Sequence, residues 1–257
     1  MAKLFHDIVF GPINSRRFGV SLGINTLPLE NKVCNFNCIY CECGWTDLKN
    51  NTARFFSEGV ITKNVIEKFK LLASKKTRID AITFAGNGEP TMHPKFKEIV
   101  ACVKLNRDLY FPGTPIIILS NGFLLNSKRV IEGLELADEC IMKLDARTNE
   151  LFQLIDQPLK HKDLDWYVSK LINLKIPIKI QTMFLRGTFN GKKIDNTTPS
   201  EISAWTKLVQ KINPNEVMLY TIDRTPPLNT ISKVEIKELS KINHQLLELG
   251  INSKIYF

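Results

Sequence analysis

The sequence predicts an α/β fold, a partial (β/α)6 barrel of parallel strands with outer helices. Short apolar runs alternate with amphipathic helical stretches from about residue 60 to the end. Most of these runs are apolar throughout, as expected for parallel strands that are covered on both faces. Nearly 60 of the 257 residues precede the first full helix, which leaves too few for an eight-unit barrel. An open doubly wound sheet is the alternative, and six barrel units fit the length better.

The predicted strands are short apolar runs, and helical stretches separate most of them. Strand–helix units in series imply parallel strands joined by right-handed crossovers. In such sheets the functional site lies beyond the carboxyl ends of the strands. The six predicted strands cover residues 20–25, 81–85, 116–119, 140–144, 178–184 and 217–222.

The predicted helices carry apolar residues at helical spacing, so that each presents one face for burial. Thr198-Pro199-Ser200-Glu201 combines a capping box with proline at the first helical position, and Ser232-Lys233-Val234-Glu235 has the pattern of a second capping box. The apolar faces consist of Val65, Ile66, Phe69 and Leu72, of Ile202, Trp205, Leu208, Val209 and Ile212, and of Leu239, Ile242, Leu246 and Leu249. Further helices are predicted over 95–106, 127–136 and 163–175.

Size and composition indicate one domain over residues 1–257, with an N-terminal extension at 1–19 and a long loop at 26–60. No stretch reaches the roughly 18 apolar residues that are needed to cross a bilayer. Residues 1–7 lack the features of a signal peptide. We therefore expect a cytoplasmic protein with no membrane partner, either a monomer or a weak dimer.

The chain is basic. Lysine and arginine outnumber aspartate and glutamate by 35 to 26, which gives a formal charge of +9. This balance suits a partner that carries phosphates, RNA included. A dispersed basic surface that only aids solubility explains the charge equally well, because the basic clusters are short and scattered.

Three cysteines crowd into eight residues of the long loop. Cys34, Cys38 and Cys41 have the spacing C-x3-C-x2-C and follow the first predicted strand. Three thiolates from one loop can hold three corners of a [4Fe–4S] cluster, which usually takes four cysteine ligands. The fourth iron then has an open position for a substrate or cofactor.

A zinc site is the main alternative for this loop. Zinc would require a fourth ligand, commonly from a second cysteine or histidine pair, and the sequence has no such pair. Cys43 could supply that ligand by spacing alone. Cys102 and Cys140 are isolated, so we predict no auxiliary cluster and expect both to be buried. The spacing favours a cluster over zinc.

The C-x3-C-x-aromatic-C loop resembles the signature of the radical S-adenosylmethionine (SAM) superfamily. The resemblance implies that the open iron chelates the amino and carboxylate groups of SAM, and that Tyr40 lies near the adenine. The segment around Gly86, Asn87, Gly88 and Glu89 resembles the family's GGE element, although Asn87 separates the two glycines. There, exposed backbone and an acid meet the methionine amine. By itself, this segment would be only a tight turn.

Other strand ends match polar positions that the family directs toward SAM. Ser120 and Asn121 end the third predicted strand, and the alternative for Asn121 is a turn leading into the next helix. Lys143 and Asp145 end the fourth, where Asp145 could instead cap a helix or turn. Gln181 on the fifth strand is a weaker candidate for the same pocket.

Residues 11–25 and 220–224 resemble the wybutosine-like branch of the superfamily, and the resemblance spans residues 10 to 226. The candidates for contacting substrate are Arg16, Arg17, Lys143 and Arg224. Guanidinium groups pair bidentately with phosphate or carboxylate. An ion pair with a strand-end acid such as Asp223 is the alternative for the first two. His93 is either an acid or base, or a residue packed under a loop, and the second interpretation is favoured.

The resemblance implies a radical SAM enzyme. A [4Fe–4S] cluster would cleave SAM reductively to a 5′-deoxyadenosyl radical, which abstracts hydrogen from an unidentified substrate such as tRNA or another RNA. The cofactor does the difficult chemistry, and the protein orients it. A flavodoxin-like or ferredoxin-like one-electron donor is the expected partner. The alternative is a non-catalytic iron–sulfur or zinc protein that binds nucleic acid.

Overall fold

The computed structural model describes residues 3–47, 54–160, 162–223 and 226–257. Their contacts divide the chain into two compact units. The N-terminal unit comprises Leu4–Cys34 and Thr46–Cys140, and the C-terminal unit comprises mainly Asn35–Trp45 and Ile141–Phe257. Each unit is described by itself below. A single domain over the whole chain stays a prediction.

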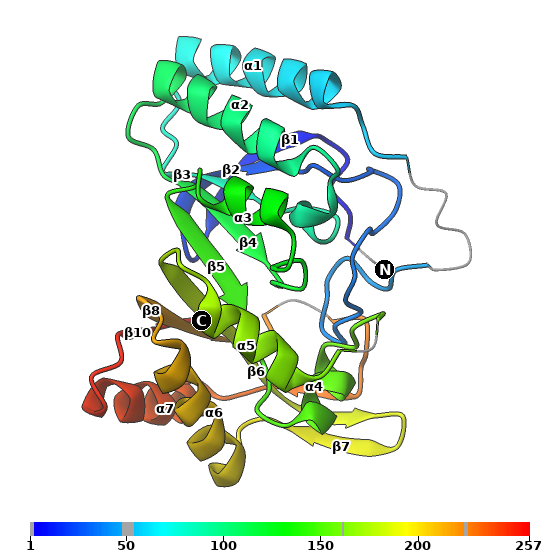
Figure 1. The fold of residues 1–257 in the computed structure, drawn as a ribbon, viewed down its shortest axis with the longest axis vertical. Helices are drawn as coiled ribbons and strands as arrows, with labels where there is room; N and C mark the ends of the chain where they lie inside the picture. Colours follow the sequence, from blue (N-terminus) through cyan, green and yellow to red (C-terminus); the bar gives the residue numbers. More distant parts are fainter. Residues whose placement is uncertain (1–2, 48–53, 161, 224–225) are drawn as a thin grey trace. The chain divides into compact units, whose positions relative to one another are not determined.

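The N-terminal unit contains strands in the order β1-β2-β3-β4. Strands β1 and β2 form an antiparallel hairpin, whereas β2, β3 and β4 run parallel, with Ser21 opposite Ala81 and Ile82 opposite Ile116. Helices α1 and α2 lie side by side (Figure 1). The elements are β1 (Val9–Ser15), β2 (Gly19–Ile24), α1 (Glu58–Ser74), β3 (Ala81–Phe84), a short 3-10 helix η1 (Pro90–Met92), α2 (Phe96–Tyr110), β4 (Ile116–Ser120) and α3 (Lys128–Leu134).

The C-terminal unit contains the end of β5 followed by β6, β8 and β10 in that order. Strands β6, β8 and β10 are parallel, with Thr182 opposite Leu219. Strand β6 continues beyond this sheet and pairs antiparallel with β7 and β9. The elements are β5 (Glu139–Lys143), α4 (Asn149–Ile155), α5 (Leu164–Asn173), β6 (Ile178–Phe189), β7 (Lys192–Asp195), α6 (Pro199–Ile212), β8 (Glu216–Thr221), β9 (Ile231–Lys233), α7 (Ile236–Glu248) and β10 (Ser253–Tyr256).

The predicted α/β class is confirmed. All six predicted strands are present, as β2, β3, β4, β5, β6 and β8. The predicted cap of α6 is also present: the Thr198 hydroxyl accepts the Glu201 N–H at 3.3 Å, and Pro199 begins the helix. Helix α1 buries Val65, Phe69 and Leu72 as expected, with Ile61 in place of Ile66. The hydrophobic patterns therefore identified the main elements.

The region of Ser232 and the N-terminal extension are among the features that differ from the sequence prediction. Ser232 does not cap a helix but lies in β9, where it pairs with Arg186 of β6. Helix α7 begins only after Glu235. The N-terminal extension 1–19 contains β1, whose exposed later half gives no apolar run to recognise. Among the described helices, none has both the length and the hydropathy that crossing a bilayer requires.

Candidate functional site

In the N-terminal unit, the glycine-rich segment after β3 supports the backbone next to Cys34. The Val33 N–H donates to the Asn87 carbonyl at 2.8 Å, and the Glu89 N–H donates to the Val33 carbonyl at 3.0 Å. Gly88 has a φ of +139°, and a Cβ there would lie 1.9 Å from the Val33 oxygen. Only glycine permits this close approach. Gly88 therefore allows the backbone of the cysteine loop to pack closely against the segment after β3.

The Asn87 side chain is occupied by backbone groups of its own unit. Its Oδ1 accepts the Phe5 N–H at 2.8 Å, and its Nδ2 donates to the carbonyls of Phe5 and Pro28, each at 2.9 Å. The side chain is completely buried. A cofactor contact of Asn87 stays a prediction, and in the structure its side-chain amide holds the loop that leads to Cys34. This use accounts for an asparagine between the two glycines, because buried backbone groups need hydrogen-bond partners.

Glu89 joins the ends of two neighbouring strands. Its Oε1 accepts hydrogen bonds from the Thr91 N–H at 3.2 Å, the Thr91 hydroxyl at 2.5 Å and the Ser120 hydroxyl at 2.8 Å. Its Oε2 accepts the Asn121 N–H at 2.7 Å. Burial raises the pKa of the Glu89 carboxyl, and these hydrogen bonds oppose the rise. The carboxyl thus links the loop after β3 to the end of β4.

Asn121 brings a polar group to the first cysteine. Its Nδ2 donates to the Cys34 Sγ at 3.7 Å, while its Oδ1 accepts the Phe123 N–H at 3.0 Å. The residue therefore makes the turn that was the alternative interpretation and also contacts the sulfur. Hydrogen bonds to cysteine sulfurs are one of the means by which proteins set the potential of a bound cluster. This unit brings together the predicted residues Cys34, Glu89, Ser120 and Asn121.

The C-terminal unit carries the other two cysteines of the motif on a tight turn. The Cys41 N–H donates to the Cys38 carbonyl at 3.0 Å, and both side chains are partly buried. Between them, Ile39 is completely buried in an apolar cluster that includes Ile155 and Leu185. This buried isoleucine anchors the turn to the core of the unit.

A buried group of polar side chains surrounds Lys143 in the same unit. The Lys143 ammonium donates to the Tyr40 hydroxyl and to Asp145, and the Tyr40 hydroxyl donates to Asp145. Lys143 Nζ also lies 2.8 Å from Asp156 Oδ1, without the geometry of a hydrogen bond. The second oxygen of Asp145, Oδ1, accepts the Met183 N–H at 2.8 Å. Asp145 therefore caps no helix, and Lys143 is engaged within the protein.

The charges of this group do not balance if both carboxyls are ionised. Burial raises the pKa of Asp156 to about 7; nearby Lys143 opposes the rise and Asp145 adds to it. Burial opposes the charge on Lys143, but Asp145 and Asp156 hold its pKa well above the usual value. Burial, and then Asp145, also raise the pKa of Tyr40. One ammonium thus neutralises one carboxylate, and Asp156 retains a proton up to about neutral pH.

The remaining predicted residues are more dispersed. Gln181 on β6 is partly buried, and its backbone carbonyl accepts the Leu144 N–H at 3.0 Å. Arg16 is exposed in the turn between β1 and β2, and the neighbouring Arg17 guanidinium lies 5.0 Å from the centroid of the Phe18 ring. Arg224 lies outside the described residues. Arg16 is therefore a surface group of the N-terminal unit, and Arg17 is partly covered.

His93 packs under a loop, as the favoured interpretation expected. Its Nδ1 accepts the Lys95 N–H at 3.0 Å, so its Nε2 carries the proton and donates to the Phe56 carbonyl at 3.0 Å. The side chain is buried, and this burial lowers the pKa of the imidazole. His93 is therefore a neutral histidine with both ring nitrogens in use, which leaves it unsuited to act as an acid or base.

The isolated cysteines differ from each other. Cys140 is buried as predicted, and burial raises the pKa of its thiol to about 12. The expectation that Cys102 is buried was wrong, because this residue lies on α2 and is only partly covered, with the Asn106 amide 3.5 Å from its sulfur. In the part of the chain that the structure describes, no group of three or more His, Cys, Asp or Glu side chains is arranged to hold a metal ion.

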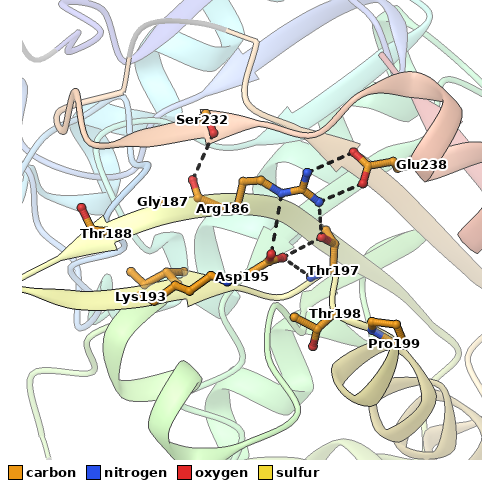
Figure 2. A pocket seen from close by; sticks show the side chains of 11 residues that line it. Arg186, Gly187, Thr188, Lys193, Asp195, Thr197, Thr198, Pro199, Ser232 and Glu238 are labelled. Carbon is orange, nitrogen blue, oxygen red and sulfur yellow. Dashed lines mark hydrogen bonds and ion pairs between the residues drawn. The ribbon is translucent and has the colours of Figure 1, made fainter.

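Sequence reasoning missed a pocket of about 810 Å³ in the C-terminal unit. Figure 2 shows Arg186 at its centre, with Glu238 on one side and Asp195 and Thr197 on the other. The guanidinium donates to Glu238 Oε1 at 2.9 Å and to the Thr197 hydroxyl, and lies 3.8 Å from Asp195. Arg186 lies beyond the predicted end of its strand at 184, so no apolar pattern marked it. Its charge is used to tie β6 to β7 and α7.

Comparison with known proteins relates the chain to one family. The model of the radical SAM superfamily matches residues 31–188. The chain is 34% identical over 244 residues to a protein named GTPase Obg from Brachyspira hyodysenteriae, covering 93% of this chain and 33% of that protein. It is 31% identical over 229 residues to a UPF0026 protein from Helicobacter pylori strain J99, covering 87% and 69%. The chain thus spans about a third of the length of the Brachyspira protein.

Solved structures share the fold at low sequence identity. A radical SAM methyltransferase from Sphaerobacter thermophilus has a TM-score of 0.63 at 13% identity, covering 91% of this chain and 65% of that one. An archaeal TYW1 has a TM-score of 0.55 at 15% identity, covering 89% and 71%. These likenesses confirm the predicted partial barrel of the radical SAM type.

The 257 residues contain no Gly-x4-Gly-Lys-Ser/Thr motif of the kind that cradles nucleotide phosphates.

Proposed function

This chain belongs to the radical SAM superfamily and to the UPF0026 proteins, and from that premise we propose that it is an enzyme in which Cys34, Cys38 and Cys41 hold a [4Fe–4S] cluster. When bound, the cluster would supply the electron that cleaves SAM to methionine and a 5′-deoxyadenosyl radical, which then removes a hydrogen atom from the substrate. The single observation that supports this most is the donor set of the cysteine loop.

The surroundings of the single thiols suit a cluster, whereas the described residues do not bring three such side chains together around a metal ion. All three thiols are partly buried, so they are shielded and still reachable by a ligand. Cys34 receives the amide N–H of Asn121, which stabilises negative charge on the sulfur. Cys38 and Cys41 lie on a turn closed by their own backbone hydrogen bond. Three such thiolates leave one iron for a non-protein ligand, as SAM chemistry requires.

For SAM we propose that the methionine ammonium binds one particular oxygen of the Glu89 carboxylate. Three donors crowd Oε1, and one donor reaches Oε2. Since an ionised carboxylate has about four acceptor positions, two on each oxygen, the remaining capacity is at Oε2. A methionine ammonium would therefore add to Oε2, beside the Asn121 N–H. The Ser120 hydroxyl fixes the orientation of the carboxyl.

Tyr40 and the group around Lys143 would shape the adenine side of the pocket. The Lys143 ammonium binds the Tyr40 hydroxyl, with its Nζ 4.5 Å from the centroid of the ring, so it holds the hydroxyl end of the ring. With Asp156 protonated, this group is electrically neutral, which suits a site that excludes water around a reactive radical. These residues therefore position the ring and move no proton in the proposed reaction.

For the substrate, we propose an RNA, which the charge of +9 supports through attraction to phosphates. A flavodoxin-like or ferredoxin-like protein would supply the electron. Thiolates that bind a cluster persist in a reducing compartment, so we place the protein in the cytoplasm. RNA that copurifies with the protein and dissociates steeply with salt would support this substrate class. Binding that is insensitive to salt would contradict it.

Anaerobic reconstitution of matched cysteine variants tests the proposed function. The wild type and Cys102→Ala should take up iron and sulfide, show the brown absorbance of a [4Fe–4S] cluster and form 5′-deoxyadenosine from SAM and dithionite. Cys38→Ala should lose all of these, because one corner of the cluster has no ligand. Full loading and SAM cleavage by Cys38→Ala, or tetrahedral zinc in the wild type, would refute the assignment.

A further inference from the structure

The middle of the cysteine loop lies against the segment that follows α4. The Asn37 N–H donates to the carbonyls of Asp156 and Gln157, each at 3.1 Å. The Ile39 N–H donates to the Ile155 carbonyl at 2.9 Å, and the Asn35 carbonyl accepts the Leu159 N–H at 2.9 Å. Every second residue between Asn35 and Ile39 is thus bonded to residues 155–159. We call this segment the clamp.

Gln157 is the unusual residue of the clamp. Its φ is +43°, in the left-handed region that residues other than glycine rarely adopt. Its side-chain Nε2 donates to the Asn37 carbonyl at 3.0 Å. Asn37 is therefore bonded through its N–H and its carbonyl, both to the clamp. A strained backbone persists where its surroundings hold it, and such outliers gather at functional sites.

Apolar packing also holds loop residues 35–39. Ile39 is completely buried, in a cluster with Ile155 and Leu185. The Phe36 ring meets the Phe152 ring of α4 edge to face, with centroids 5.7 Å apart. Phe36 and Ile39 belong to the cysteine loop, and Phe152 and Ile155 belong to α4. The loop residues that separate the cysteines are therefore attached to α4 and the segment that follows it.

We propose that Gln157 is a positioning residue for the cluster: with the clamp, it holds loop residues 35–39 in one conformation before iron arrives, so that Cys38 and Cys41 are presented together. The identity of the ligand rests on the proposed function, whereas the clamp itself does not. A ligand that binds a loop already in its bound conformation does not have to order that loop, and the ordering cost is removed.

The chain offers a matched pair of glutamines for the test. Gln157 and Gln153 are both partly buried, and each donates from Nε2 to a backbone carbonyl, Gln157 to Asn37 at 3.0 Å and Gln153 to Lys162 at 2.9 Å. Gln157→Met and Gln153→Met each remove one such bond at similar side-chain size. Only the first bond reaches the cysteine loop.

Amide hydrogen exchange of the cluster-free protein gives the first readout. In Gln157→Met, amides 37 and 39 should exchange roughly two- to tenfold faster than in the wild type, the factor expected for one lost hydrogen bond. Gln153→Met should leave them unchanged, and both variants should melt together. Gln157→Gly should also speed this exchange without lowering the melting temperature, because glycine suits the left-handed backbone.

The rate of cluster formation at limiting iron and sulfide gives the second readout. Gln157→Met should load more slowly by a similar factor and reach the wild-type absorption spectrum, while Gln153→Met should load like the wild type. Unchanged exchange in Gln157→Met would overturn the proposal that the Gln157 side chain holds the loop. Faster exchange with unchanged loading would overturn the positioning role. Failure of the wild type to load any cluster would refute the proposed function and this role of Gln157, and the exchange data would still report on the clamp.

Discussion

Replacing Asp156 by asparagine tests how the buried charges around Lys143 are balanced. Burial raises the pKa of Asp156 from 3.8 to about 7. A carboxyl with a raised pKa contributes its full stability below pH 3.8, and this stability is lost as the pH rises through about 7. Asparagine has nearly the same shape and does not titrate. The wild type should therefore lose more stability toward neutral pH than the variant, which keeps Glu89 and every other titrating group.

The magnitude follows from the displacement of the pKa. About three pH units, at about 1.4 kcal/mol each, correspond to about 4 kcal/mol over the whole range. Between pH 4.5 and 7.5 the part that develops is about 3 kcal/mol. The unfolding free energy of Asp156→Asn, minus that of the wild type, should rise by this amount across the interval.

Urea unfolding of cluster-free protein at pH 4.5, 6 and 7.5 measures this difference directly. Asp7→Asn, at an exposed position, serves as the control and should follow the wild type at every pH. The opposite model treats Asp156 as an ionised partner of Lys143, and breaking a buried ion pair costs about 3–5 kcal/mol. A difference between Asp156→Asn and the wild type that stays constant, or falls, from pH 4.5 to pH 7.5 would therefore refute the reasoning.

Three further substitutions test the supports of the cysteine loop. Ile39→Ala should lower the unfolding free energy by about 2–5 kcal/mol, because it opens a cavity in a dry core, and urea titration at pH 7 measures the loss. Gly88→Ala places a Cβ 1.9 Å from the Val33 carbonyl oxygen, so the melting temperature should fall, whereas exposed Gly59→Ala should not lower it. Glu89→Gln turns an amide toward donors and should cost about 1–3 kcal/mol, and a wild-type urea midpoint would contradict the hydrogen bonds assigned to Glu89.

The sequence was sufficient to locate the candidate site residues, but it could not show which groups of the protein these residues bind. The spacing of Cys34, Cys38 and Cys41 and the position of Glu89 after a buried strand identified the candidate site. Spacing alone could not show that the Asn87 amide binds the Phe5 backbone, because the two residues are 82 positions apart. For the same reason, the sequence could not show that the Lys143 ammonium donates to the Tyr40 hydroxyl, because these two residues are 103 positions apart.

The clamp escaped sequence reasoning for a different physical reason. Helix α4 has only seven residues, too few to show a clear apolar period, and the left-handed position after it is a glutamine where the usual signal is glycine. Asp156 carries no motif either, and its raised pKa depends on burial that only the fold creates. Long, strongly patterned elements were predictable, and short irregular supports were not.

The intervening residues of the cysteine motif therefore carry as much structural information as the cysteines. Asn35 and Asn37 are bonded through their backbones to the clamp, and Ile39 fills the core beneath it. Backbone bonding at alternate residues constrains the length of the loop, because inserting one residue would shift every later residue out of register with the clamp. The three residues between Cys34 and Cys38 thus meet two requirements: they keep the loop in register with the clamp, and they set the spacing of the proposed cluster ligands. For this reason, a cysteine displaced by one position should fail to complete the site even though its thiol is retained.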